Sequence, residues 1–247
     1  MAEPAVLILG GTSLAMGLAR AVSGLDLRAI YSLAGRTEPK SLPEMEVRTG
    51  GFGGAAALAD YLRRESIAAV VDATHAYAAG ISANARAACA DANIPLLRLQ
   101  ERPWRATPGD NWIEAADIAE ARDKAAEIAS RVFVSTGRQT MAEFAADPRC
   151  WWLARVIARG DDLPVLSSGE YIYARGPFDL ADERVLLRDH DISAVISKNA
   201  GSAATYPKIA AARELALPVI MIARPAFEDA EQVGSVADTV SWVQSKS

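Results

Sequence analysis

The chain has 247 residues, about half of them hydrophobic, and a net charge of −5 with a pI near 5.2. An acidic chain offers no broad basic stripe, so we expect no nucleic-acid partner. Two isolated histidines and two cysteines, Cys89 and Cys150, without CxxC spacing exclude a familiar metal site or disulfide scaffold. No leader or apolar run of membrane-spanning length is evident, so we expect a cytoplasmic protein.

The first hundred residues alternate between apolar strand-like runs and helical segments. Strands are predicted at 5–9, 27–34, 44–48, 68–72 and 94–98, and helices at 12–22, 54–64 and 78–92. Successive strand–helix units of this length predict a parallel sheet with right-handed crossovers.

Residues 100–111 interrupt this alternation with Pro103, Pro108 and Gly109, which favours a connector. Beyond it, helices are predicted at 113–130, 206–215 and 235–244, and strands at 132–134, 152–158, 193–197 and 217–222. We therefore predict an α/β protein of two Rossmann-like three-layer domains, 1–100 and 101–247, with mostly parallel sheets and a cleft between them.

Glycine-containing turns follow three consecutive strands of the first half, and two of these turns, after the first and third strands, carry paired glycines. Gly10-Gly11-Thr12-Ser13 follows the first strand, where a dinucleotide places its pyrophosphate on backbone N–H groups. It departs from G-x-G-x-x-G, so alone it is weak evidence. Gly50-Gly51-Phe52 lies in a second turn that permits close approach of a ligand. Together these turns predict a dinucleotide site along one sheet edge.

Arg36 and Thr37 come at the end of the second strand, where NAD-binding sites usually carry an acid. A cation and a hydroxyl suit a 2′-phosphate, so NADPH is the expected cofactor. His75 and Tyr77 follow the fourth strand, and we place both at this site rather than in the core. Asp72, which precedes them, could cap the next helix or contact the ligand, and we interpret it as a helix cap.

Two turns of the second half combine hydroxyls, a glycine and a cation. One comprises Ser135, Gly137, Arg138 and Gln139, and the other Lys198, Asn199, Gly201 and Ser202. Such turns suit carboxylates or phosphates, although capped helix starts with solvated cations would look the same. We predict that they bind an anionic substrate facing the dinucleotide edge.

These motifs make the chain resemble the precorrin-6A reductase family of cobalamin biosynthesis. The matching segments run in order through nearly the whole chain: 8–12, 34–37, 48–53, 71–77, 98–104, 135–138, 197–201, 217–220 and 224–225. The most distinctive are Asp-Ala-Thr-His-Ala-Tyr at 72–77 and Ser-Lys-Asn at 197–199. Members often carry an acid where this chain has Leu14, which leaves any role of that acid open.

The resemblance implies that NADPH reduces a double bond of the precorrin-6A macrocycle to give precorrin-6B. Hydride would reach an electron-poor carbon, and a neighbouring carbon would take a proton. The substrate carries many carboxylates, for which Arg138 and Lys198 are plausible partners. Asp147, His75 and Lys198 are the candidate catalytic residues, with Asp147 as a proton donor, although an Asp before Pro148 is also typical of a turn.

Two other hypotheses stay open at this point. An NADPH-dependent reductase or epimerase of another small substrate would usually present Tyr-x-x-x-Lys on a helix, which we do not find. A non-catalytic NADP-sensing protein would not need the cationic turns of the second half. Hand-over of the tetrapyrrole to neighbouring pathway enzymes is conceivable, and the oligomeric state is open.

Overall fold

Strand β1 (Ala5–Leu9) occupies the middle of the first sheet, and all five of its side chains are buried. A continuous buried run fits a strand covered on both faces, as in parallel α/β sheets. The structure is a computed structural model that describes residues 3–35, 44–227 and 231–246. Among these residues, no helix is both long and apolar enough to cross a membrane.

The chain divides into two compact units, the first made of residues 1–102 and 225–247 and the second of residues 103–224. The described part of the first unit holds a six-stranded parallel sheet in the order β12-β5-β4-β1-β2-β3. Its other strands are β2 (Arg28–Leu33), β3 (Glu46–Thr49), β4 (Ile67–Asp72), β5 (Leu96–Leu99) and β12 (Glu231–Val233). Its helices are α1 (Ser13–Val22), α2 (Ala55–Arg64), α3 (Ala79–Ala92) and α8 (Val236–Gln244).

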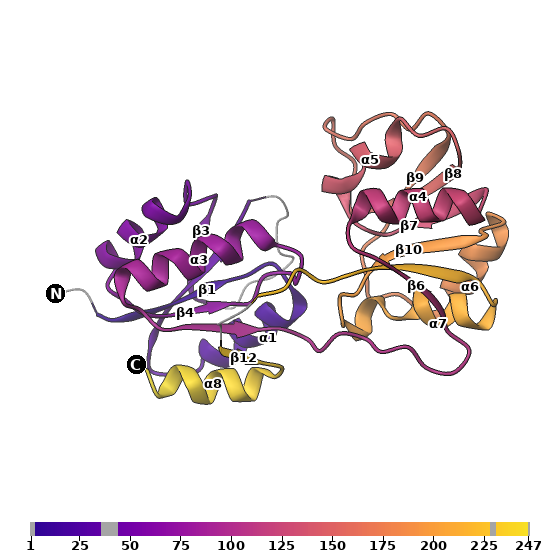
Figure 1. Cartoon of the computed structure of the whole chain (residues 1–247). Helices are drawn as coiled ribbons and strands as arrows, with labels where there is room; N and C mark the ends of the chain where they lie inside the picture. Colours follow the sequence, from indigo (N-terminus) through magenta and orange to yellow (C-terminus); the bar gives the residue numbers. More distant parts are fainter. Residues whose placement is uncertain (1–2, 36–43, 228–230, 247) are drawn as a thin grey trace. The chain divides into compact units, whose positions relative to one another are not determined.

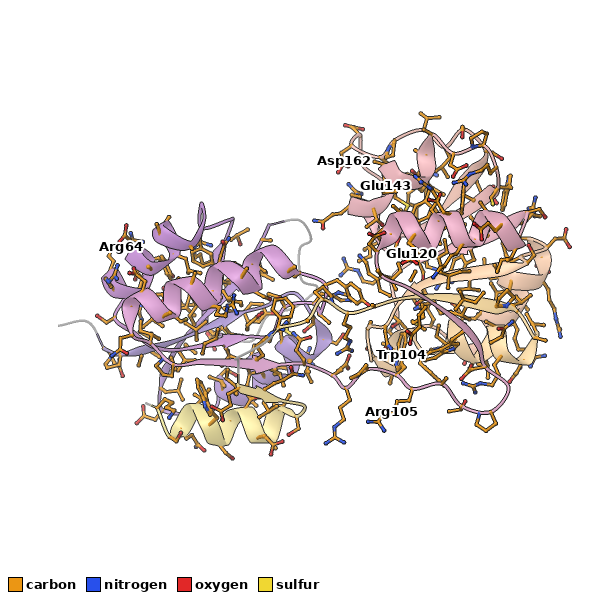
Figure 2. The ribbon with its side chains drawn as sticks, viewed as in Figure 1. Arg64, Trp104, Arg105, Glu120, Glu143 and Asp162 are labelled. Atoms are coloured by element: carbon orange, nitrogen blue, oxygen red, sulfur yellow. The ribbon has the colours of Figure 1, made fainter. Side chains whose placement is uncertain are left out.

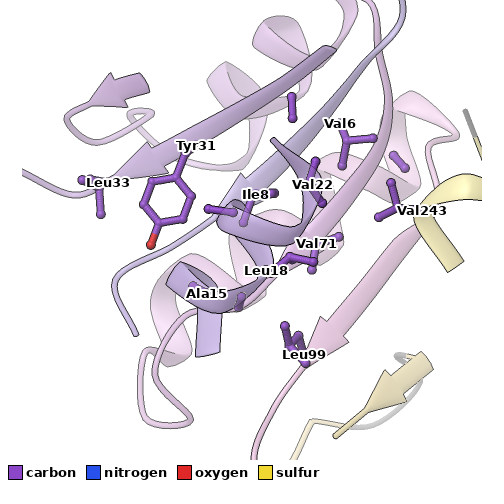
Figure 3. Packing of buried hydrophobic residues seen from close by; sticks show 14 residues of the cluster. Val6, Ile8, Ala15, Leu18, Val22, Tyr31, Leu33, Val71, Leu99 and Val243 are labelled. Carbon is purple, nitrogen blue, oxygen red and sulfur yellow. The ribbon is translucent and has the colours of Figure 1, made fainter. Parts of the chain in front are cut away.

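Helices α1 and α8 cover one face of this sheet, and α2 and α3 cover the other (Figure 1). On the first face, Ile8 and Val71 of the strands pack with Leu18 and Val22 of α1 and with Val243 of α8 (Figure 3). Burial of such aliphatic side chains contributes roughly 1.5–3 kcal/mol each. The two covered faces leave the strand ends as the exposed edges of the sheet.

The second unit repeats the architecture with a parallel sheet in the order β6-β11-β10-β7-β8-β9. Its strands are β6 (Asn111–Ala115), β7 (Arg131–Val134), β8 (Trp151–Val156), β9 (Gly169–Tyr173), β10 (Ala194–Lys198) and β11 (Pro218–Ile222). Its helices are α4 (Ile118–Ile128), α5 (Ala142–Ala145), α6 (Leu180–Asp189) and α7 (Pro207–Glu214), with short 3-10 turns at Arg138–Thr140 and Ala203–Thr205. Helices α6 and α7 pack on one face and α4 on the other (Figure 1).

The predicted fold class is confirmed, but three predicted features differ from the structure. The predicted helix 113–130 is wrong at its start, because β6 occupies residues 111–115 and α4 begins only at Ile118. The Asp117 carboxylate accepts the N–H of Glu120, the Glu120 carboxylate accepts the N–H of Ala116, and these two hydrogen bonds fix the helix start. Strand β9 and helix α6 lie in a stretch, 159–192, for which no element was predicted.

The C-terminal segment also differs from the predicted domain 101–247, because residues 225–247 belong to the first unit. Strand β12 pairs with β5, and the N–H of Gln100 donates to the Val233 carbonyl oxygen over 3.0 Å. Val236 and Val240 of α8 pack against the core around α1. The apolar side chains of the C-terminal helix predict that it is buried, but they do not reveal which of the two sheets it covers.

Candidate active site

The turn after β1 brings the backbone close to any ligand. A Cβ at Gly10 would overlap the Tyr31 ring, so the position accepts only glycine. Gly11 has a φ of +117° and open space where a Cβ would stand. Its N–H donates to the Tyr31 hydroxyl over 3.2 Å, and burial raises the pKa of Tyr31. The tyrosine therefore stays protonated and fixes the turn.

Thr12 and Ser13 lie where α1 begins. Thr12 Oγ1 accepts the N–H of Ala15 over 3.0 Å and donates to the Ala73 carbonyl oxygen over 2.9 Å. Ser13 is exposed, and the first turn of α1 carries no acidic side chain. An accessible helix N-terminus without an acid favours an anion such as a pyrophosphate. The Thr12 hydroxyl thus caps α1 and joins it to the end of β4.

Arg48, at the end of β3, organises the second glycine turn and was not singled out from the sequence. Its guanidinium donates to the carbonyl oxygens of Gly50 and Gly51, the latter over 2.7 Å, and lies 3.7 Å from the centroid of the Phe52 ring. Gly50 adopts a φ of +116°, and a Cβ at Gly50 or Gly51 would meet no atom within 4 Å. The turn is open yet held by a cation.

Arg36 and Thr37, the predicted 2′-phosphate contacts, lie outside the described residues, so their role stays a prediction. The carboxyl ends of β2 and β3, the strands before and after these two residues in the sequence, contact each other. The Gly50 N–H donates to the Leu33 carbonyl oxygen over 2.8 Å, and a Cβ at Gly35 would lie 3.1 Å from Cγ2 of Thr49. This contact places the second glycine turn beside the end of β2.

His75 is exposed and Tyr77 half-buried, so neither is a core residue, as predicted. The Tyr77 N–H donates to Nδ1 of His75 over 3.3 Å, and the two ring centroids are 5.6 Å apart. Because Nδ1 accepts, the neutral imidazole carries its proton on Nε2. In this form His75 can donate a hydrogen bond from Nε2.

A buried network under this loop gives Asp72 a different role from the one predicted. Its Oδ1 accepts from the N–H of Thr74 over 3.1 Å and from the Thr74 hydroxyl over 2.6 Å, and its Oδ2 accepts from the Ser82 hydroxyl. Nε of Arg98 lies 3.3 Å from Oδ2, and burial lowers the pKa of Arg98. Asp72 therefore joins the loop that follows β4 to α3 and β5.

In the second unit, the two predicted turns meet at the carboxyl edge of the sheet. Strands β7 and β10 are parallel neighbours, with Val134 opposite Ile196. The N–H of Ser135 donates to the Ile196 carbonyl oxygen over 3.2 Å, and Nζ of Lys198 donates to the Thr136 carbonyl oxygen over 2.7 Å. Burial lowers the pKa of Lys198. A partly desolvated ammonium at this edge is suited to a carboxylate.

The other predicted residues of the turn after β7 are Gly137, Arg138 and Gln139. Gly137 has a φ of +89° and begins the 3-10 turn that contains Arg138 and the exposed Gln139. Arg138 forms an ion pair with Asp162 and donates to the Ala158 carbonyl oxygen. An exposed pair of this kind contributes only about 0–1 kcal/mol, so a substrate carboxylate could compete for the guanidinium.

The side chain of Asn199 binds the backbone of Trp104, near the start of the second unit. Its Oδ1 accepts the Trp104 N–H over 2.7 Å, and its Nδ2 donates to the Trp104 carbonyl oxygen over 3.0 Å. Its own carbonyl oxygen accepts from Nε of Arg224 over 2.6 Å. Gly201 follows with a φ of +84°, and Ser202 precedes the 3-10 turn Ala203–Thr205. Asn199 is thus a structural link in this turn.

Asp147 lies away from the carboxyl edge that carries the other candidate residues. It precedes β8 instead of following a strand, which places it at the amino edge of a parallel sheet. Its carboxylate accepts two hydrogen bonds from Nε of Arg149, at 2.9 and 3.0 Å, and lies 3.4 Å from Nε of Arg122. These arginines hold its pKa below the usual range, so the geometry argues against Asp147 as a proton donor.

Comparison with known proteins agrees with these motifs over nearly the full length. The model of the family described as precorrin-6x reductase CbiJ/CobK matches residues 5–244. The chain is 42% identical over 240 residues to a precorrin-6A reductase of Rhodococcus erythropolis, covering 96% of both chains. It is 39% identical over 238 residues to a precorrin-6A reductase of Rhodobacter capsulatus, covering 96% of this chain and 95% of the relative.

A solved structure titled CobK precorrin-6A reductase has the same fold. It matches with a TM-score of 0.91 and 38% sequence identity, over 98% of this chain and 97% of that one. The match spans both six-stranded parallel sheets. The chain accordingly belongs to the precorrin-6x reductase family, as its motifs predicted.

Proposed function

We propose that this chain reduces precorrin-6A to precorrin-6B in cobalamin biosynthesis, with NADPH as the reductant. The observation that carries the proposal is its similarity to precorrin-6A reductases along 96% of its length. Reduction of one double bond consumes one NADPH and one proton and yields NADP. A reducing, cytoplasmic setting fits the two buried free cysteines.

The first unit supplies a site that fits an extended dinucleotide. Gly11 leaves room for a pyrophosphate beside the N-terminus of α1, and Gly50, Gly51 and Phe52 form an open turn at the end of β3, two strands away from β1. Both features lie at the carboxyl edge, where such sheets bind dinucleotides. NADPH, when bound, supplies the hydride. Arg36 and Thr37 select it over NADH by contacting the 2′-phosphate.

The second unit binds the macrocycle. Lys198 and Arg138 pair with substrate carboxylates, and the backbone of Ser135, Gly137, Gly201 and Ser202 adds donors around them. The ammonium of Lys198 is already held at the Thr136 carbonyl oxygen, so little ordering is needed on binding. Fixing the macrocycle by several carboxylates orients its reacting carbon, and positioning of this kind can supply a large part of a rate enhancement.

Two residues remain as candidates to deliver the proton. Lys198 gives up a proton more readily than an ordinary lysine because burial lowers its pKa. His75 could deliver a proton only as the imidazolium, because the neutral ring is far too weak an acid. In the neutral ring its Nδ1 accepts from the Tyr77 N–H. Tyr77 thus serves as the residue that orients His75. Neither role requires the ion-paired Asp147.

The proposal is tested by turnover with purified protein under anaerobic conditions. With precorrin-6A present, the protein should oxidise one equivalent of NADPH and little NADH. An NADPH-dependent reductase or epimerase of another substrate would bind NADPH without oxidising it against the tetrapyrrole. An NADP-sensing protein would give the same result, so the assay separates the proposed reduction from both alternatives.

A further inference from the structure

Trp104, which is labelled in Figure 2, contacts Asn199 in the turn that carries Lys198, at the carboxyl edge of the second sheet. The Asn199 side chain holds both backbone polar groups of Trp104, at 2.7 and 3.0 Å. Asn199 directly follows Lys198 in the sequence, so the clamp joins Trp104 to the substrate-binding cation. The indole itself is only half-buried.

The indole is braced by α7 and the turn before it. The centroid of the Tyr206 ring lies 5.6 Å from that of Trp104, with the rings at 59°. Nζ of Lys208 lies 5.2 Å from the indole centroid and donates to the Thr205 carbonyl oxygen over 2.9 Å. Arg213 in turn donates to the Tyr206 hydroxyl. A ring held this firmly loses little further freedom when a ligand stacks on its accessible part.

The cations at this edge recognise the charge of the substrate but not its conjugated surface. Lys198 and Arg138 recognise carboxylates, and many small polycarboxylates carry those. A precorrin also presents a broad conjugated surface, which gains most from contact with a flat aromatic side chain. The half-exposed indole next to Lys198 is suited to supply that contact.

We propose that Trp104 is a substrate-binding residue on which the conjugated part of the tetrapyrrole stacks, while Lys198 holds one of its carboxylates. This inference rests on the proposed function of the second unit. Asn199 is then a positioning residue instead of a substrate contact, because it acts through the Trp104 backbone. Trp104 thereby selects a large conjugated ring over small anions of the same charge.

Binding of the tetrapyrrole without NADPH separates this role from a purely structural one. Trp104→Leu keeps apolar bulk but removes the ring, and should raise the tetrapyrrole Kd about tenfold or more. Trp104→Phe keeps a ring and should stay within about threefold. The NADPH Kd should change less than about twofold in both. Asn199→Ala should raise the tetrapyrrole Kd in the same direction and leave the NADPH Kd unchanged.

Trp242→Leu is the matched control, because that indole is also half-buried but lies on α8 of the first unit and donates to Glu231. It should leave the tetrapyrrole Kd unchanged. A tetrapyrrole Kd for Trp104→Leu equal to that of the wild type overturns the inference. If the wild type binds NADPH but no tetrapyrrole, the proposed function itself fails, so the two failures are distinguishable.

Fluorine NMR of the wild-type protein tests the same inference even if Trp104→Leu does not fold. The wild-type protein labelled with fluorotryptophan gives one fluorine NMR signal for each of its five tryptophans, and Trp104→Phe identifies the signal of Trp104. Addition of the tetrapyrrole should shift that signal most, because fluorine chemical shifts respond to direct contact and to local electric fields, which a stacked ligand changes only over short distances. A binding-competent protein in which the Trp104 signal stays in place contradicts the stacking.

Discussion

The ammonium of Lys198 lies 2.7 Å from the carbonyl oxygen of Thr136, and this hydrogen bond joins the turns that follow β10 and β7. The two turns are 62 residues apart in the sequence but meet because their strands are parallel neighbours. The cation is therefore held in place before any substrate arrives.

Lys198→Ala should raise the KM for the tetrapyrrole by about ten- to hundredfold, because a charge-assisted contact contributes roughly 1.5–3 kcal/mol. Lys198→Arg should recover part of the loss, since it restores the charge with altered geometry. NADPH binding, followed by cofactor fluorescence, should stay nearly intact in both. A tenfold loss of NADPH affinity would instead place Lys198 at the cofactor.

Arg36→Ala should weaken NADPH binding by about ten- to hundredfold and leave NADH binding almost unchanged, because only NADPH carries the 2′-phosphate. The measurement is a pair of cofactor titrations. Arg20→Ala, an exposed position in the last turn of α1, is the control and should change neither affinity. Equal weakening of both cofactors by Arg36→Ala would refute the 2′-phosphate contact.

The sequence predicted the two α/β halves and most of the turns at the strand ends, because apolar runs and glycine turns are local signals. It did not predict that Arg48 holds the second glycine turn, because the sequence around an arginine does not reveal which backbone carbonyl groups it contacts. It misplaced Asp147 because position along the chain does not reveal the edge of the sheet. The partner sheet of β12 and α8 depends on long-range packing that periodicity does not encode.

Asp147→Asn should cost roughly 1.5–3 kcal/mol of stability at neutral pH, because the buried carboxylate loses its charge-assisted bonds to Arg149. The native pKa of Asp147 is lowered, so this contribution is present above its unfolded pKa and is lost as pH falls through the folded pKa. Denaturant unfolding of wild type and variant should therefore converge in acid.

The activity of Asp147→Asn gives the corresponding check on catalysis. Specific activity of the folded variant should match the wild type, since Asp147 lies at the amino edge of its sheet. Asp60→Asn, which breaks only an exposed pair with Arg63, is the stability control. A folded Asp147→Asn protein with a large loss of kcat would restore Asp147 as the acid.

Lys208→Met should stabilise the protein most at about pH 6 and progressively less toward about pH 10. Burial, together with the charge of Arg155, lowers the pKa of Lys208 from 10.5 to about 7. Between these values the unfolded chain binds more protons than the folded one, so wild-type stability rises with pH across this window. Lys124→Met on α4 controls for the loss of a lysine. A pH-independent difference in urea midpoint between Lys208→Met and wild type would contradict the assignment.

The most direct test of the proposed reduction is the fate of the transferred hydrogen. The protein is incubated anaerobically with precorrin-6A and NADPH that carries deuterium at the transferred position, and the product is analysed by mass spectrometry. The account predicts a product that has gained one deuterium from the cofactor and one hydrogen from solvent, with one NADPH oxidised per macrocycle. A reduced macrocycle without deuterium, or bound NADPH and tetrapyrrole that remain unchanged together, would contradict it.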